Sequence, residues 1–295
     1  MTQFFDTLKQ VVQSDGVTPT EGVVRHVHWQ FRKLFHQFPC ELQLSHSRLY
    51  VDRPGGVAAL VNAMDTYDYN NMNFLQVMLR RYGGTFIDVG ANIGSYTLIA
   101  SEVSSARIIS IEPHPTTFGL LTENVRRNKR GNVTCLNCAL SGTENECTFE
   151  DNLESSINRV VSGHDTPGAF VRVECRTLDS VCRELEVFPD FVKIDVEGHE
   201  SAVLDGFGEF CTRARIISIE GGESVVVRRW MQESGYLGPW FVHYKQHSLS
   251  TVKQARPEDP VFVHKSYVAE INSAGFCSPA ISLANAAGVL SKCKQ

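Results

Sequence analysis

The 295-residue sequence lacks the features that would assign it to a membrane, a nucleic acid or the secretory route. It has no run of about 18 consecutive apolar residues, the minimum for a membrane-spanning helix. Its 28 lysines and arginines are interspersed among 33 aspartates and glutamates, so no basic stripe is present to neutralise a run of phosphates. Its first residues, MTQFFDTLKQ, lack the basic and apolar regions of a signal peptide. We therefore expect a cytoplasmic protein that binds neither membranes nor nucleic acids.

The cysteines form no regular framework. There are nine of them, an odd number, which favours a reducing compartment, and a chain of this length can bury a full core without cross-links. Cys135 and Cys138 make a C-x-x-C pair, but the pair lies along a predicted strand and no second pair follows at zinc spacing. We interpret them as core cysteines and expect no metal at this position.

From Gly83 onward, β-branched apolar runs alternate with helical patterns, which is typical of βαβ units and a parallel sheet with helices on both faces. The runs are TFIDV, ARIISIE, NVTCLN, DFVKIDV and ARIISIE again. The pattern predicts an α/β domain over residues 81–254. Residues 1–80 form an N-terminal extension, whose aromatic segment MDTYDYNNMNFL is a possible lid on the acceptor side, and residues 255–295 form a tail of unknown role.

The stretch from Ser141 to Arg176 interrupts this alternation. CTFE and FVRVEC read as two strands around a polar loop that contains Asn152, Ser155, Ser156 and Gly163. We interpret the stretch as a small insertion in a crossover, placed where it reaches the edge of the active site.

A glycine turn follows the first core strand in FIDVGANIGSYTLIA. Counted from Gly90, the second and third positions of a dinucleotide-binding Gly-x-Gly-x-x-Gly pattern are Asn92 and Ser95, and no lysine follows Gly94 as in a P-loop. S-adenosylmethionine, which has no pyrophosphate, is the remaining common ligand. Glu112, 22 positions after Gly90, is placed to accept hydrogen bonds from both ribose hydroxyls.

The fourth core strand ends in a polar row, with Lys193, Asp195 and Glu197 at alternate positions. Burying an unpaired charge is costly, so this row must be paired, hydrated or engaged with a ligand. The candidates for a general base that removes an acceptor proton are Asp195, His199 and Glu220.

The other polar residues near the strand end have supporting roles in this interpretation. We expect Glu197 and Glu200 to cap the following helix and Lys193 to pair with a carboxylate. Asp195 and Glu220 could together bind a divalent cation, but the adjoining Asp-Asn pair of metal-dependent O-methyltransferases is missing, so we assign no metal.

Several segments together resemble the FkbM family of class I S-adenosylmethionine-dependent methyltransferases. They are FIDVGANIGSYT, IISIEPHPTTFGLLTENV, LNCALSG, VKIDVEGHESAVLDG and IISIE, between Tyr82 and Glu220. The resemblance implies a Rossmann-like, mostly parallel seven-strand sheet with helices on both faces, and O-methylation of a hydroxyl on a sugar or secondary metabolite. It also implies that Glu112 binds the ribose and that further residues bind the rest of the cofactor: Asp88, Gly90, Ala91, Asn92 and Gly94 in the loop, and Asn137 and Ala139 at the adenine.

Two alternatives of a different class stay open at this point: a nucleotide-binding (NAD-type) oxidoreductase, and a non-catalytic S-adenosylmethionine-binding module. Methyltransferases that act on amino groups of DNA bases carry Asp/Asn-Pro-Pro-Tyr/Phe after the fourth strand, where this chain has Asp195-Val196-Glu197-Gly198. The expected acceptor is therefore a small molecule or a glycan, and the sequence specifies neither its identity nor the oligomeric state of the protein.

Overall fold

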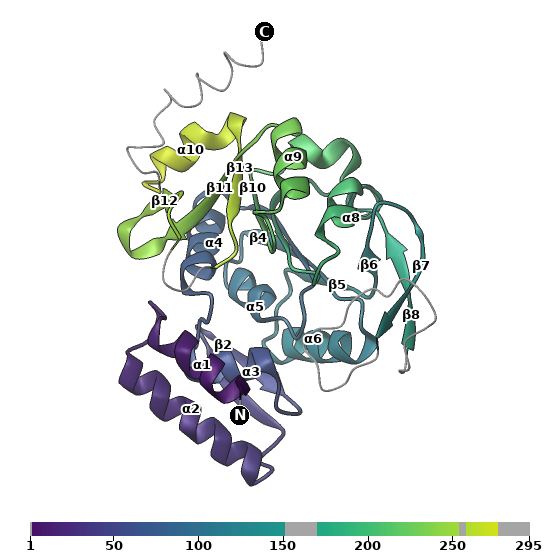
Figure 1. Cartoon of the computed structure of the whole chain (residues 1–295). Helices are drawn as coiled ribbons and strands as arrows, with labels where there is room; N and C mark the ends of the chain where they lie inside the picture. The colour runs from purple at the N-terminus through teal and green to yellow at the C-terminus, as the bar shows by residue number, and fades with distance from the viewer. Residues whose placement is uncertain (1, 151–169, 254–257, 277–295) are drawn as a thin grey trace.

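The structure is a computed structural model that describes residues 2–150, 170–253 and 258–276, with an eight-stranded sheet at its centre (Figure 1). In spatial order the strands are β12 (Ser248–Ser250), β11 (Tyr236–His243), β13 (Val261–His264), β10 (Ile216–Ile219), β9 (Pro189–Ile194), β3 (Gly84–Val89), β4 (Ala106–Ile111) and β5 (Val133–Leu136).

The five strands from β10 to β5 are parallel to one another, and β13 is antiparallel to both of its neighbours. The chain order reverses between β3 and β9, because β4 and β5 continue on one side of β3 and β10 continues beyond β9. The class I methyltransferase fold expected from the sequence is confirmed, with β12 added at one edge. Ligands of such sheets bind where the chain order reverses.

Helices cover both faces of the sheet because consecutive strand residues point in opposite directions. Phe86 packs in a core that includes α4 (Tyr69–Tyr82) and α5 (Ser95–Ser101). Its neighbour Ile87 packs in a second core with α7 (Leu178–Glu184), α8 (Glu200–Asp205) and α9 (Val225–Glu233). The short 3-10 helices are η1 (Gly208–Thr212), η2 (Tyr244–Gln246) and η3 (Lys265–Tyr267).

The N-terminal segment forms a small helical unit with one hairpin, at the lower end of Figure 1. It comprises α1 (Thr2–Val12), α2 (Pro19–Leu34), β1 (Cys40–Leu44), β2 (Ser47–Val51) and α3 (Gly56–Met64). Strand β2 lies against α6 (Pro115–Arg127), where the buried Asn124 side chain bonds both backbone groups of Tyr50. The hairpin is thereby fixed next to the carboxyl edge of the central sheet.

The insertion contains the two strands expected from the sequence, in a separate sheet of order β6 (Ala139–Leu140), β8 (Phe170–Arg176) and β7 (Asn145–Glu150). A disulfide joins Cys147 to Cys175 across β7 and β8, which corrects the expectation of reduced, unlinked cysteines. The two residues meet because they sit diagonally on one face of an antiparallel pair. The predicted polar loop with Asn152, Ser155, Ser156 and Gly163 lies outside the described residues.

Part of the C-terminal segment belongs to the central sheet, although the sequence analysis placed residues 255–295 outside the domain of residues 81–254. Strand β13 inserts between β10 and β11, all four of its residues are buried, and α10 (Val268–Ser273) follows it. Three apolar residues and a histidine are too few to reveal a strand by periodicity, so no sequence pattern indicated this insertion. Within the part of the chain that the structure describes, no helix has both the length and the apolar character needed to cross a bilayer.

Candidate active site

A cavity of about 230 Å³ opens at the carboxyl ends of β3, β4 and β9, where the chain order of the sheet reverses. Its wall comes from the loops that follow these three strands, from Cys138–Leu140 at β6, and from residues 51–58 between β2 and α3. Sheets of this type bind their ligands at this edge, so the cavity is the candidate active site.

Two glycines shape the loop after β3, because Gly90 and Gly94 have positive φ angles of +77° and +95°. A Cβ atom on Gly90 would lie 1.9 Å from the backbone oxygen of Asp195, so the loops after β3 and β9 touch at this point. Gly94 begins α5 in the left-handed conformation. Gly90, Ala91 and Asn92 line the cavity, whereas Gly94 supports the turn from outside the cavity wall.

Glu112 lies in the cavity wall directly after β4 and is 7% exposed. Its two carboxyl oxygens accept hydrogen bonds from the backbone N–H groups of Asn92 and His114, both at 2.9 Å. Burial raises the pKa of Glu112 to about 7, and the two backbone donors only partly oppose this rise. The backbone segments after β3 and β4 thus hold the Glu112 carboxyl group in place in the cavity wall.

Asp88 is buried at the end of β3 and also borders the cavity. Its Oδ2 accepts a hydrogen bond from the Thr97 hydroxyl at 2.7 Å, and that hydroxyl also contacts Ser110 Oγ at 2.7 Å. Burial raises the pKa of Asp88, although Lys193 opposes the rise. The side chain therefore ties α5 to the cavity floor.

Residues around β6 form the opposite end of the cavity wall. Ala139 lines the cavity together with Cys138, but Asn137 does not. The Asn137 side chain donates to the backbone oxygens of Glu112 and Pro113, each at 2.9 Å, and so fixes the segment after β4. Cys135 and Cys138 are free thiols whose pKa burial raises to about 11, in keeping with their interpretation as core cysteines.

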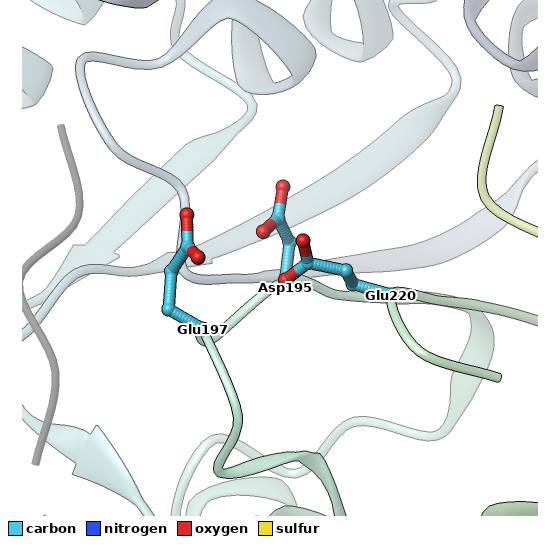
Figure 2. A group of neighbouring side chains, drawn as sticks. All are labelled: Asp195, Glu197 and Glu220. Carbon is cyan, nitrogen blue, oxygen red and sulfur yellow. The ribbon is translucent and has the colours of Figure 1, made fainter. Parts of the chain in front are cut away.

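Three carboxyl groups gather after β9 and β10: Asp195, Glu197 and Glu220, each with an oxygen within 4.8 Å of the others (Figure 2). Lys193 precedes them in β9, is 4% exposed, and places its Nζ 2.7 Å from Asp195 Oδ2. The expected pairing of Lys193 with a carboxylate is thus present. Glu197 was expected at the cap of the following helix but lies in this cluster of three carboxyl groups. Glu200 accepts a hydrogen bond from the Gly198 backbone N–H at 2.8 Å.

The carboxyl groups of Asp195 and Glu220 lie close enough for each to shift the pKa of the other. Removal from water and repulsion by Asp195 raise the pKa of Glu220 to about 8. Partial burial would also raise the pKa of Asp195, but the Lys193 ammonium and the hydrogen bond from Glu220 outweigh it and lower that pKa. The pair therefore presents an ionised Asp195 beside a protonated Glu220.

His199 is also in the cavity wall, at the N-cap of α8, but on the side of the small sheet. Its Nε2 lies 3.4 Å from Ser141 Oγ, and burial lowers the pKa of its imidazole. The structure therefore brings Asp195 and Glu220 together and sets His199 apart from them.

The three carboxyl groups are spaced closely enough to hold a hard divalent cation. The Lys193 ammonium supplies a positive charge at Asp195, and the Glu220 carboxyl group donates a hydrogen bond to the same carboxylate. Asp195 therefore has two partners within the protein.

Two parts of the cavity wall were not identified from the sequence. One is Tyr67, whose hydroxyl lies 3.2 Å from Ser95 Oγ, inside the aromatic segment read as a possible lid. The other is the loop between β2 and α3, which carries Arg53. The run Pro54-Gly55-Gly56 is the sign in the sequence that the chain turns there.

The fold and the cavity define a class I S-adenosylmethionine-dependent methyltransferase. The glycine loop has no dinucleotide pattern, and it borders the cavity together with the carboxyl groups of Asp88, Glu112 and Asp195. The chain belongs to the FkbM methyltransferase family, since the model of the methyltransferase FkbM domain matches residues 88–237.

Named relatives agree with this assignment. The chain is 34% identical over 135 residues to the hexuronic acid methyltransferase AglP of Haloferax volcanii, which covers 45% of this chain and 54% of that protein. It is 30% identical to methyltransferase sdnD of Sordaria araneosa, over 42% of this chain and 60% of that protein. The matches thus span little more than half the length of these relatives.

Solved structures with a similar arrangement are distant in sequence. An O-methyltransferase from Bacillus cereus matches at 12% identity and a TM-score of 0.39, over 66% of this chain and 80% of that one. The TDP-rhamnose 3'-O-methyltransferase CalS11 of calicheamicin biosynthesis matches at 10% identity and a TM-score of 0.42, over 68% and 79%.

Proposed function

We propose that the protein transfers the methyl group of S-adenosylmethionine to a hydroxyl group of a sugar or a sugar-containing secondary metabolite. The observation that carries the proposal is the Asp195–Glu220 carboxyl pair beside the cofactor loop, which can take up the proton that a hydroxyl acceptor must lose. The hexuronic acid methyltransferase among the relatives supports a sugar as the acceptor.

In this reaction the acceptor oxygen forms a bond to the methyl carbon while the bond from that carbon to sulfur breaks. S-adenosylmethionine supplies the methyl group already activated on a sulfonium. The residues of this chain then have two tasks: to align the acceptor hydroxyl within about 3 to 3.5 Å of the methyl carbon, and to accept its proton. Asp195 accepts the hydrogen bond from the hydroxyl, and the Asp195–Glu220 pair takes the proton.

The two alternatives from the sequence are weaker. A nicotinamide-dependent oxidoreductase conflicts with membership of a methyltransferase family. A non-catalytic module would have no use for a carboxyl pair that shares a proton beside the cofactor loop.

The function is tested by incubating the full chain with methyl-labelled S-adenosylmethionine and a panel of sugars, sugar acids and glycosides, then identifying the labelled product. Label recovered as a methyl ether on a sugar hydroxyl supports the proposal. Label recovered on a nitrogen or carbon atom, or as a methyl ester of a carboxylate, would contradict it.

Glu112→Ala should weaken S-adenosylmethionine binding by about 1.5–3 kcal/mol, the scale of a hydrogen bond to a charged group. The reason is the loss of the carboxyl group that the Asn92 and His114 N–H groups hold at the cavity. Isothermal titration calorimetry on the folded variant measures the effect. Glu123→Ala, on the outer face of α6, is the control and should bind like the wild type. An unchanged dissociation constant for Glu112→Ala would remove this residue from the cofactor site.

The pH dependence of kcat/KM should follow Glu220, whose pKa is raised to about 8. Below that pH Glu220 holds a proton and the pair is a weaker base, so the rate should rise as pH increases through about 8. In Glu220→Gln this rise should vanish, whereas Glu197→Gln should keep it. A profile that is flat between pH 6 and pH 9 in the wild type would rule out the pair as the base.

A further inference from the structure

Among the residues that the structure describes, the cavity wall contains two with lysine or arginine side chains, Lys193 and Arg53. Each pairs with a carboxylate, Lys193 with Asp195 and Arg53 with Asp52, but the Lys193 side chain is buried. Arg53 comes from the loop between β2 and α3, and its side chain remains 42% exposed. Arg53 is thus the guanidinium that a ligand in the cavity can reach.

The loop that carries Arg53 is held in place by the protein. Asn124, a fully buried residue of α6, accepts from the Tyr50 N–H at 2.6 Å and donates to the Tyr50 carbonyl at 3.1 Å. The same side-chain amide donates to the Ile93 carbonyl in the cofactor loop at 2.9 Å. One side chain therefore joins the end of β2, three residues before Arg53, to the loop that receives the cofactor.

Asp52 orients the guanidinium from one edge. Its carboxylate contacts Arg53 Nε at 3.2 Å and Nη2 at 2.9 Å, and this hydrogen bond raises the pKa of Arg53. A guanidinium is a planar fork of donors that suits a planar carboxylate. The contact with Asp52 limits the freedom of the side chain before a ligand arrives, which lowers the entropy cost of binding.

The charges of the cavity indicate which anion is recognised. The residues that line it include five carboxyl groups: Asp52, Asp88, Glu112, Asp195 and Glu197. A doubly charged phosphate would meet strong repulsion there, whereas a singly charged carboxylate needs only one cation. We propose that Arg53 binds a ligand carboxylate, which comes either from the methionine part of S-adenosylmethionine or from an acidic sugar acceptor.

The first arm of the test concerns the cofactor and needs no acceptor. S-adenosylmethionine and its decarboxylated form are titrated into the wild type, Arg53→Met and Arg53→Lys. If the carboxylate belongs to the cofactor, Arg53→Met should bind S-adenosylmethionine about 10- to 100-fold more weakly and should bind the decarboxylated form as the wild type does. Arg53→Lys, which keeps the charge without the fork, should fall between the two.

The second arm concerns the acceptor and rests on the proposed function. Glucuronate and glucose are titrated in the presence of S-adenosylhomocysteine. If the carboxylate belongs to the acceptor, the wild type should prefer glucuronate, and Arg53→Met should lose that preference while its affinity for S-adenosylmethionine stays unchanged. If the acceptor is not a sugar, neither glucuronate nor glucose should bind to any variant, and the cofactor titrations of the first arm should be unaffected.

Arg48→Met is the matched control, because Arg48 lies on β2 of the same hairpin with a side chain that is 70% exposed and outside the cavity wall. It should match the wild type in both arms. The proposal is overturned if Arg53→Met, folded as judged by its thermal unfolding, changes neither the preference for the carboxylated cofactor nor that for glucuronate. It is also overturned if both cofactor forms lose affinity equally.

Discussion

Asp195→Asn is expected to lower kcat by about 10² to 10⁴, the usual scale for a positioned acid–base group, with little change in the affinity for S-adenosylmethionine. The side chain is held beside the cofactor loop because the Asp195 backbone oxygen lies against Gly90. Asparagine keeps the size of the side chain but cannot accept the proton of the acceptor. Single-turnover kinetics with a confirmed acceptor, together with calorimetric titration of the cofactor, measure the two effects separately.

His199→Asn provides the comparison, since His199 lies in the same cavity wall but contacts Ser141. If the base is the Asp195–Glu220 pair, His199→Asn should retain far more activity than Asp195→Asn. High pH should partly restore Asp195→Asn, because more of the acceptor is then ionised without help. Near-normal turnover in Asp195→Asn combined with a large loss in His199→Asn would transfer the role of base to the histidine.

The central strands of the fold could be predicted because their sequences carry the signal locally. Phe86–Val89 and Ala106–Ile111 consist mostly of large apolar residues, interrupted by Asp88, Arg107 and Ser110, as is typical of strands covered on both faces. The spacing between Gly90 and Glu112 likewise follows from one βαβ unit, which is why the sequence alone placed both beside one ligand. The failed dinucleotide and P-loop patterns then indicated S-adenosylmethionine, and the family resemblance pointed to the same cofactor.

Other features depend on contacts between segments far apart in the chain. Strand β13 has only four residues, and its place between β10 and β11 is decided by the sheet edge that it fills. The Cys147–Cys175 link depends on the register of two strands, which no cysteine count reveals. Arg53 lies at the cavity because the hairpin packs against the central domain, where Asn124 bonds both the preceding strand and the loop after β3.

The alternation of polar residues from Lys193 to Glu197 was recognised in the sequence. The pairing and protonation of these side chains were not. Sequence spacing showed that Lys193, Asp195 and Glu197 share one side of the chain. It did not show that Glu220, which follows β10, donates a hydrogen bond to Asp195 while Lys193 lowers the pKa of the same carboxyl group. The different protonation of Asp195 and Glu220 arises because β9 and β10 are neighbours in the folded sheet.

Lys193→Met should destabilise the protein by about 3–5 kcal/mol at pH 8, the cost of leaving buried carboxylates without their cation. Lys193 is 4% exposed, pairs with Asp195, and lies opposite Asp88 in the register of β9 and β3. Its ammonium also lies 4.8 Å from the centre of the Tyr96 ring. Methionine preserves the apolar stem over that ring, so the expected loss is mainly electrostatic. Urea unfolding of the variant measures it.

The pH dependence of this loss separates charge from packing. Without the ammonium, the pKa values of Asp88 and Asp195 in the folded protein should rise above their values in the unfolded chain. The folded variant then binds more protons than the unfolded chain, so its deficit should be largest above neutral pH and should shrink as pH falls toward 5. Lys245→Met, an exposed lysine near Asp15, should stay within about 0.5 kcal/mol of the wild type at every pH. A deficit for Lys193→Met that is equal at pH 5 and pH 8 would mean that the lysine stabilises the fold through packing, and that Asp195 does not depend on it for its charge.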